Sequence, residues 1–296
     1  MALNVLLQTF RPSFLILTPV CVFLGFSTAF TAQTPINILS VALILIGAIS
    51  AHISVNTLNE YADYKSGLDF LTVKTAFSGG SGALPEQPKM ATAVLFSGLL
   101  TLSLTIGIGL YFIQTYGIHI LPMGLIGTLL IISYTPWINR SPLLCLIAPG
   151  LGFGVLMVVG THVLISDSFT ILPWLVSLTP FCLINNLLLL NQYPDIDADK
   201  SVGRKTFPIA YGTRKSSQAY AGFILVAYSL IVLLVMTGEL PELCLIAVAP
   251  LILSLYALTG AYRHSSQIGQ HPKYLASNVA AAILTPLLLA VSIIAG

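Results

Sequence analysis

Long hydrophobic stretches, separated by shorter polar segments, recur along the whole chain. A helix that crosses the hydrocarbon core of a bilayer needs about 20 consecutive, mostly apolar residues. A window of that length predicts nine transmembrane helices, at about 12–31, 36–60, 90–114, 117–135, 142–165, 170–193, 216–237, 240–262 and 273–295. We therefore expect an all-α membrane protein, a bundle of nine transmembrane helices, in which residues 1–296 form a single integral-membrane domain.

The composition agrees with lipid as the main solvent. Hydrophobic residues make up 56% of the chain and charged residues only 7%, whereas a soluble domain has about 25% charged residues. So little charge cannot cover a water-exposed surface, which excludes an ordinary soluble protein. The net charge of +2 gives no information about partners, and we expect no nucleic acid among them. The four cysteines all lie within apolar stretches, where we expect them to be packing residues.

The distribution of positive charge predicts the orientation of the bundle. With nine helices, all twelve Lys and Arg residues fall on the side of the N-terminus, and the other side carries only Asp167, Glu239 and Glu242. Positive charge is retained in the cytoplasm, so we expect a cytoplasmic N-terminus. Two long polar loops, at about 61–89 and 194–215, then share the cytoplasmic face. The first apolar run follows a single positive charge, Arg11, and is expected to be a retained helix rather than a signal peptide.

A polar motif closes the second predicted helix. Asn56, Asn59 and Asp63 recur there at helical spacing, so we expect their side chains on one face of the helix. A second motif closes the sixth predicted helix, where Asn191, Asp195 and Asp199 predict another such stripe. Asp197 would point away from that stripe, and we give it a weaker role.

The pattern Asn-x3-Asp thus occurs twice, at Asn59/Asp63 and Asn191/Asp195. Each copy ends the second long hydrophobic unit of its half of the chain. This repeat indicates two possible internal halves, at about 12–135 and 142–262, followed by the ninth helix.

Carboxylates that face one another at membrane depth are costly and are usually functional. Hard oxygen ligands favour Mg²⁺, which proteins hold with a few carboxylates and the phosphate of a substrate. Basic residues follow both motifs: Lys65 and Lys74 after the first, and Lys200, Arg204 and Lys205 after the second. One Asp-rich loop alone would be better explained as a solvated loop end. Two matching motifs on one face instead predict a clamp for a diphosphate.

At these residues the sequence resembles the UbiA superfamily of intramembrane aromatic prenyltransferases. The first motif, Asn59-Glu60-Tyr61-x-Asp63-Tyr64-Lys65-x-Gly67-x-Asp69, is most similar to that of the menaquinone branch, the 1,4-dihydroxy-2-naphthoate polyprenyltransferases. The second motif, Asn191-x3-Asp195-x3-Asp199-x3-Gly203-Arg204-Lys205-Thr206, is similar to the second motif of the family, and Arg11-Pro12 is similar to its opening. The resemblance covers nearly the whole chain and implies nine helices and bound Mg²⁺.

Three positions depart from the family pattern. Glu60 stands where Asp is commoner, which keeps the carboxylate on a longer side chain. Pro194 replaces a basic residue and is expected to kink the end of the sixth helix. Phe153 follows Gly-Leu-Gly where the menaquinone branch tends to carry Glu, so the acceptor stays less well defined than the donor.

The resemblance implies a Mg²⁺-dependent enzyme that transfers a prenyl or polyprenyl group from a prenyl diphosphate to an aromatic acceptor of quinone biosynthesis. It implies metal ligation by Asn59, Asp63, Asp69, Asn191, Asp195 and Asp199. The diphosphate is expected to bind Arg11, Lys65, Lys74, Lys200, Arg204 and Lys205, and the expected catalytic residues are Asp63, Asp195, Lys65 and Arg204. The enzyme is expected in the bacterial inner membrane, with its site facing the cytoplasm and the isoprenoid tail in the bilayer.

Other polar residues have more than one interpretation. Four tyrosines near the cytoplasmic ends are either interfacial residues or groups that stabilise a carbocation: Tyr61, Tyr64, Tyr134 and Tyr193. The glycine-rich segment Ser78–Gly82 is either a closing lid or a linker. His52 and His162 lie within predicted helices, where we expect interior histidines with satisfied hydrogen bonds.

Two alternatives to this function stay open. Within the same enzyme class, the acceptor is 4-hydroxybenzoate, homogentisate or a non-aromatic alcohol, or the enzyme is a prenyl diphosphate-dependent cyclase with no acceptor. From another class, a cation-coupled transporter would use the Asp stripes as an ion pathway. Transporters usually place such groups near the midplane in broken helices, whereas both motifs here are predicted at one face and beside basic residues.

Overall fold

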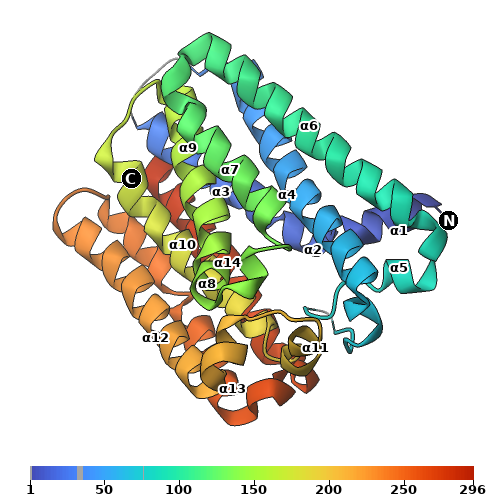
Figure 1. Cartoon of the computed structure of the whole chain (residues 1–296). Helices are drawn as coiled ribbons and strands as arrows, with labels where there is room; N and C mark the ends of the chain where they lie inside the picture. The colour runs from blue at the N-terminus through green and yellow to red at the C-terminus, as the bar shows by residue number, and fades with distance from the viewer. Residues whose placement is uncertain (1, 32–35, 76) are drawn as a thin grey trace.

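The structure, a computed structural model, describes residues 2–31, 36–75 and 77–296, which form helices and short connections without a strand (Figure 1). The α-helices are α1 (Ala2–Thr9), α2 (Pro12–Leu15), α3 (Leu17–Phe30), α4 (Ile38–Ser66), α5 (Ala83–Glu86), α6 (Ala91–Tyr116), α7 (Leu121–Ser133), α8 (Pro142–Pro149), α9 (Val158–Ser166), α10 (Ile171–Asn191), α11 (Ile196–Ser201), α12 (Phe207–Met236), α13 (Leu251–His264) and α14 (Pro272–Ala295). Short 3₁₀ segments are η1 (Leu68–Phe70), η2 (Pro88–Met90), η3 (Ile118–Ile120), η4 (Ile138–Arg140), η6 (Glu242–Val248) and η7 (Ser265–Gln270), and η5 (Gly150–Met157) is π-helical.

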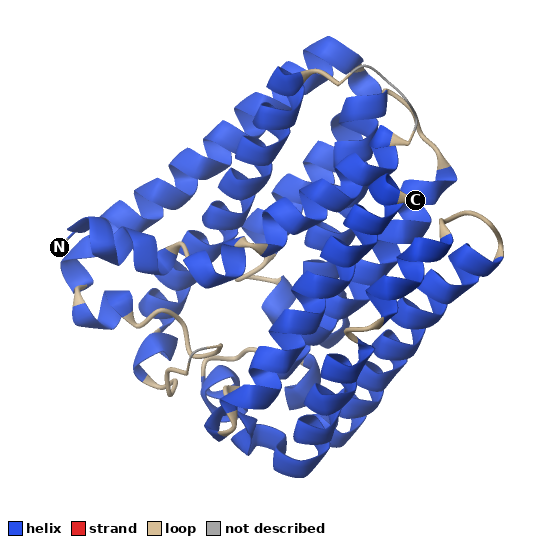
Figure 2. Ribbon diagram, turned by 180° about the vertical axis from the view of Figure 1, so that it is seen from behind, coloured by secondary structure: helices blue, strands red, loops and turns tan. Residues whose placement is uncertain are grey.

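The helices confirm a multi-pass membrane protein. Within the described ranges, eight helical segments are long and apolar enough to cross a bilayer, and Ile118–Ser133 is a ninth, shorter apolar segment. Each predicted transmembrane region coincides with one of these nine segments. The two chain ends lie at opposite ends of the bundle in both views, as an odd number of crossings requires (Figures 1 and 2). Nine crossings and a cytoplasmic N-terminus stay predictions.

Asn56, Asn59 and Asp63 of the first motif lie on one continuous helix, as predicted, whereas Asp69 lies beyond it in η1. The helix α4 begins at Asn37, whose side chain accepts hydrogen bonds from the backbone N–H groups of Leu39 and Ser40. It runs to Ser66, beyond the predicted end at residue 60, because the polar residues after Asn59 continue the helix. It ends at Gly67, whose φ of 82° gives the left-handed conformation that commonly terminates helices.

The second motif is not one helical stripe, so that prediction is wrong. The helix α10 ends at Asn191, and α11 begins only at Ile196. Pro194 explains the break, because proline lacks a backbone N–H and disfavours helical geometry in the preceding residue. Asp195 immediately precedes α11, and Asp199 lies one turn further on, with its N–H bonded to the carbonyl oxygen of Asp195 at 2.8 Å.

The core of the bundle surrounds α10. Its buried apolar residues, including Leu183, Ile184 and Leu187, belong to one large cluster that also takes in residues of α3, α12, α13 and α14. The segment η5 approaches α10 very closely. A Cβ atom on Gly154 would lie only 2.4 Å from the backbone nitrogen of Phe181, so this position requires glycine.

The helices α6 and α7 form a looser wall on one side of the bundle (Figure 1). None of the α7 residues is buried, and α6 exposes large apolar side chains such as Phe96, Leu100 and Leu110. Such an apolar surface is unfavourable in water and suits contact with lipid tails. Behind this wall lies a cavity lined in part by residues of α4, α6 and α7.

Candidate active site

Arg204 joins the two acidic motifs. Its Nη1 donates a hydrogen bond to Oδ1 of Asp199 at 2.9 Å, and its Nη2 donates to Oδ1 of Asp63. The motifs therefore meet in space although 141 positions separate Asp63 from Arg204. Burial lowers the pKa of Arg204, but the two carboxylates raise it by more, so the guanidinium stays charged. Burial raises the pKa of Asp199, and Arg204 opposes this shift.

Asn59 holds the carboxylate of Asp63 from the same helix. Its Nδ2 donates to Oδ2 of Asp63 at 3.0 Å, one helical turn away, and lies 3.3 Å from Oγ1 of Thr135. The predicted stripe on α4 is therefore confirmed for Asn59 and Asp63, whereas Nδ2 of Asn56 donates to the carbonyl oxygen of Phe10 at 3.0 Å. Thr135 did not emerge from the sequence, since nothing local indicates that the α7–α8 connection returns to α4.

The glycine-rich segment lies between the two motifs. The backbone N–H of Gly79 donates to Oδ2 of Asp195 at 3.0 Å. Gly80 lies beside Asp69, because a Cβ atom on Gly80 would be 3.0 Å from Oδ1 of that residue. Both glycines have φ values near the left-handed region, 79° and 71°, that disfavour other residues. In this structure the glycine-rich segment therefore contacts both acidic motifs.

Glu60 anchors the same segment to α4. Its side chain is 3% exposed, and its Oε1 accepts hydrogen bonds from Nε of Arg11 at 3.1 Å and from the backbone N–H of Ser81 at 2.8 Å. Its Oε2 accepts a third bond from the Ser81 hydroxyl at 2.6 Å. This residue, noted in the sequence only as a departure from the family pattern, thus connects α4, the N-terminal segment and the glycine-rich segment.

The donor atoms at the site fit a hard divalent cation. Three buried oxygen atoms have no hydrogen-bond partner among the described residues: Oδ2 of Asp69, Oδ1 of Asp195 and Oδ1 of Asn191. No three His, Cys, Asp or Glu side chains within the described ranges are close enough to hold a metal by themselves. That arrangement suits Mg²⁺, which keeps several waters and binds through one or two carboxylates plus substrate phosphates.

Two of these carboxyls titrate near neutral pH. Burial, with the nearby charges of Glu60 and Asp63, raises the pKa of Asp69 from 3.8 to about 7. Burial, with the charge of Asp199, raises the pKa of Asp195 from 3.8 to about 7, although the bond from Gly79 opposes this shift. Both groups therefore lack a full counter-charge from the protein, and a bound cation would supply it.

The lysines predicted to bind the diphosphate are not held at the carboxylates. Lys65, Lys74, Lys200 and Lys205 are all exposed, and in the part of the chain that the structure describes none forms an ion pair. Lys65 lies over the ring of Tyr61, 5.7 Å from its centroid. The structure thus brings Arg204 and Arg11, but not Lys65, into contact with the motifs. Asp197 is exposed, in agreement with its weaker predicted role.

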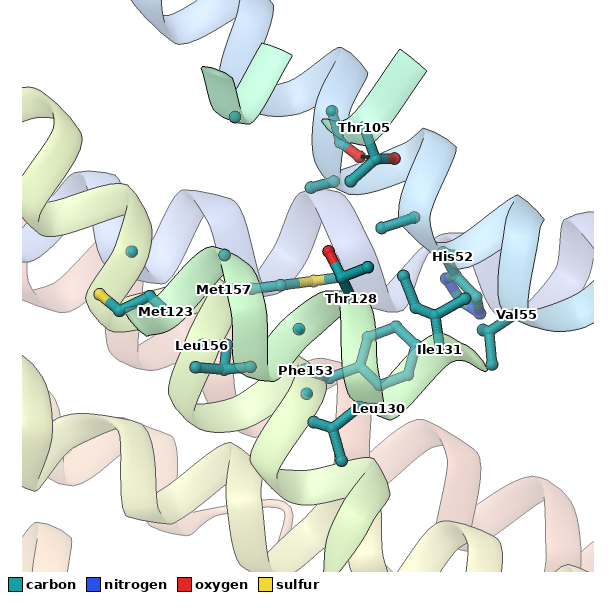
Figure 3. Close-up of a pocket in the computed structure, with 18 of the residues that line it drawn as sticks. His52, Val55, Thr105, Met123, Thr128, Leu130, Ile131, Phe153, Leu156 and Met157 are labelled. Carbon is teal, nitrogen blue, oxygen red and sulfur yellow. Dashed lines mark hydrogen bonds between the residues drawn. The ribbon is translucent and has the colours of Figure 1, made fainter. Parts of the chain in front are cut away.

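A cavity of about 550 Å³ opens from the polar residues into the apolar bundle. One end is lined by Arg11, Asn59 and Asn191. The remaining walls come mainly from α4, α6, α7, η5 and α9 and are largely apolar; Figure 3 shows Leu130, Ile131, Phe153, Leu156 and Met157 among them. The volume lies in the usual range for a small-molecule site.

The four candidate tyrosines separate in the structure. Tyr134 lines the cavity. Tyr193 does not, because its hydroxyl donates to the carbonyl oxygen of Thr213 at 3.0 Å in the core. Tyr61 and Tyr64 pack against the small cluster around Leu84.

These features define a polytopic membrane protein with a cavity that is lined by Arg11, Asn59 and Asn191 and by largely apolar walls. Residues 18–281 match the UbiA prenyltransferase family, and the chain therefore belongs to this family of enzymes. A relative, 1,4-dihydroxy-2-naphthoate octaprenyltransferase of Bacillus subtilis (strain 168), is 29% identical over 245 residues, which are 79% of this chain and 75% of the relative.

Two solved structures share the fold. The apo structure of a UbiA homologue from Aeropyrum pernix K1 has a TM-score of 0.70 at 17% identity, covering 94% of this chain and 98% of the other. A UbiA homologue from Archaeoglobus fulgidus, bound to DMAPP and Mg²⁺, has a TM-score of 0.63 at 16% identity, covering 98% and 99% of the two chains. At these sequence identities, the similarity shows a shared fold and no more.

Proposed function

We propose that this protein transfers a prenyl or polyprenyl group from an allylic prenyl diphosphate to 1,4-dihydroxy-2-naphthoate in a Mg²⁺-dependent reaction. One observation carries this proposal: a single cavity has Arg11, Asn59 and Asn191 at one end and apolar walls elsewhere. A prenyl diphosphate has the same division, with an anionic head and a hydrocarbon tail. The acidic motifs that surround the polar end explain why a divalent cation would accompany the head.

The predicted metal ligands stay those of the two motifs: Asn59, Asp63, Asp69, Asn191, Asp195 and Asp199. The unpartnered oxygen atoms of Asp69, Asn191 and Asp195 support this assignment. When bound, Mg²⁺ would neutralise the negative charge that develops on the leaving diphosphate.

The side chains of the protein have separate tasks in this reaction. Arg11 keeps guanidinium N–H groups for the diphosphate, since only its Nε is bonded to Glu60. Arg204 supplies fixed positive charge between the motifs, where it stabilises the anion that forms. As the bond between the allylic carbon and the diphosphate oxygen breaks, its electron pair leaves with the diphosphate. An electron pair of the acceptor ring forms the new bond to the allylic carbon, and the attacked ring carbon then loses its proton, or its carboxylate as CO₂. The apolar cavity walls exclude water from the electron-poor carbon.

The identity of the acceptor is a separate part of the proposal. The name of the Bacillus subtilis relative and the first motif both favour 1,4-dihydroxy-2-naphthoate. The alternatives are 4-hydroxybenzoate and homogentisate. A cation-coupled transporter is a weaker alternative, because Arg204 lies between two of the carboxylates and would oppose passage of a cation.

We further propose that the site faces the cytoplasm. The reason is the positive charge of the loops on that side of the bundle, since positively charged loops are retained there.

Identification of the product tests the proposed function. Membranes that contain the protein are incubated with geranyl diphosphate, Mg²⁺ and one acceptor at a time, and extracted lipids are analysed by mass. We expect a prenylated product from 1,4-dihydroxy-2-naphthoate and much less from 4-hydroxybenzoate or homogentisate. Membranes with Asp195→Asn serve as the matched control. A product formed only from another acceptor would replace the naphthoate assignment, and no product from any of them would contradict prenyl transfer.

A further inference from the structure

Two buried histidines of the membrane-spanning helices differ in their hydrogen bonding. Each ring is bonded through Nδ1 to a threonine of α3: His52 to Thr18 at 2.8 Å, and His162 to Thr28 at 3.0 Å. His162 completes its bonding, because its Nε2 lies 3.2 Å from the hydroxyl oxygen of Thr170. Nε2 of His52 has no such partner among the described residues. The expectation of a satisfied interior histidine is therefore confirmed for His162 and only half met by His52.

His52 also lines the cavity, whereas His162 is absent from its lining. Figure 3 shows the His52 ring extending from α4 toward Phe153 and Ile131. Its ring packs edge-on against Phe153, with 4.5 Å between the centroids. The side chain is thus fixed by Thr18 and Phe153, and its residue is only 4% exposed. A rigid, buried ring with one unused nitrogen at a cavity wall is suited to bind a ligand.

The position of His52 along α4 indicates which part of a ligand it meets. His52 precedes Asn59 by seven residues on the same face of the helix, which places it about 10 Å deeper in the bundle. The cavity residues still deeper on α4 are Ala51, Ala48, Gly47 and Ile44, which offer only apolar surface. His52 therefore lies at the boundary between the polar end and the apolar remainder of the cavity.

We propose that Nε2 of His52 binds a hydroxyl group of the acceptor and thereby makes the site specific for a hydroxylated aromatic ring. This inference rests on the proposed prenyl transfer, because the acceptor must reach the allylic carbon just below the diphosphate. A prenyl tail alone would leave the ring nitrogen unpaired in an apolar surrounding, which is unfavourable.

A hydroxyl group can bond to Nε2 in either of the two neutral tautomers of the His52 ring. If His52 donates from Nδ1 to Thr18, its Nε2 accepts a hydrogen bond; if Thr18 donates to Nδ1, Nε2 carries the proton and donates. A hydroxyl group can donate to the first form and accept from the second. A carboxylate could serve only the second form, so a ring hydroxyl is the better assigned partner.

Two substitutions separate this role from a packing role. His52→Asn retains an amide group near the position of Nδ1, and so keeps a partner for Thr18, but has no atom at Nε2. His52→Gln places its amide nitrogen near Nε2 and gives up the Thr18 contact. The matched control is His162→Asn, at a ring of similar burial with both nitrogens bonded to the protein.

Kinetic constants of the full-length protein in membranes test the role. With geranyl diphosphate as donor and 1,4-dihydroxy-2-naphthoate as acceptor, we expect His52→Asn to raise the KM for the acceptor about tenfold. The KM for the donor should stay within about twofold, and His52→Gln should resemble the wild type more closely than His52→Asn does. Equal increases of both KM values, or the same effect from His162→Asn, would overturn the inference in favour of packing.

Binding without turnover distinguishes failure of this inference from failure of the proposed function. Thermal shift of the purified protein is measured with the dihydroxynaphthoate and with its O-methylated analogues. We expect the wild type to bind the dihydroxy compound about tenfold more tightly than at least one methyl ether, and His52→Asn to lose this preference. No preference in the wild type would overturn the role of His52, even if transfer occurs. If the wild type prefers the dihydroxy compound over the methyl ether but forms no prenylated product, the proposed reaction is contradicted and the role of His52 in binding is kept.

Discussion

The guanidinium of Arg204 is bonded to the carboxylate of Asp63, a residue 141 positions earlier in the chain. A second bond, to Asp199, makes Arg204 the cation between the two acidic motifs. Asp63 is also bonded to Asn59, and Asn59 in turn lines the cavity.

Replacement of Arg204 should therefore affect both folding and activity. Arg204→Gln removes the counter-charge of two buried carboxylates, which typically costs about 3 kcal/mol of stability. We expect a lower Tm and a loss of prenyl transfer of at least about 100-fold. The control is Arg214→Gln, which removes an exposed arginine of α12. Activity of Arg204→Gln above half of the wild type would show that the bridge is not needed.

The three hydrogen bonds of Glu60 predict a second effect. Glu60→Gln removes the negative charge that faces Arg11 and replaces one acceptor oxygen by an N–H donor, so at least one of the three bonds loses its acceptor. We expect faster hydrogen exchange in residues 77–82 and transfer reduced about tenfold. Glu86→Gln, at an exposed position of α5, should change neither quantity. Unchanged exchange in Glu60→Gln would mean that Glu60 does not hold the segment.

The conformation of Gly79 predicts a third effect. Gly79→Ala places a Cβ atom 2.8 Å from the carbonyl oxygen of Val73 and forces φ of 79° on a residue that avoids it, at a cost of about 1–2 kcal/mol. The N–H bond to Asp195 should weaken and transfer should fall about tenfold. The control is Gly222→Ala in α12, where an added Cβ meets nothing within 4 Å. Equal activity of both variants would contradict a role for the Gly79 geometry.

The carboxyls of Asp69 and Asp195 predict how stability depends on pH. Each has an ordinary pKa of 3.8 and a pKa of about 7 in the folded protein. Between these values the folded protein binds more protons than the unfolded chain, so the free energy of unfolding falls as pH rises. Without divalent cations, we expect a higher Tm at pH 5 than at pH 8.

Added Mg²⁺ should restore part of the stability that the protein loses as pH rises. It competes with protons for the same carboxylates and should raise Tm more at pH 8 than at pH 5. The combined variant Asp69→Asn/Asp195→Asn should show a flatter pH profile and a smaller effect of Mg²⁺. A Tm that rises from pH 5 to pH 8 in the cation-free wild type is the outcome that excludes these shifts.

The local features of this protein could be predicted from its sequence. Helix positions follow from the length of apolar runs, which is a local property. The stripe Asn59/Asp63 needs only the helical repeat, and the proximity of the two motifs follows from their expected location on one face. The break before Asp195 is harder to predict, because a proline can either kink a helix or end it, and Pro194 separates α10 from α11.

Features that depend on packing between distant segments could not be predicted. Arg11, Glu60 and Ser81 come together only after three segments fold against one another. His52 and His162 look alike in sequence, since both lie in apolar stretches. Only the structure shows that one ring is fully bonded while the other faces the cavity.

The most direct test of a metal-dependent prenyl transfer at this site removes the metal and then the carboxylates. Membranes containing the wild type are assayed for product with excess EDTA and again after Mg²⁺ is restored. We expect EDTA to abolish transfer and Mg²⁺ to restore it, while Asp63→Asn and Asp195→Asn stay inactive in both conditions although they insert into membranes normally. Turnover of the wild type in excess EDTA, or wild-type activity of either variant, would contradict the mechanism.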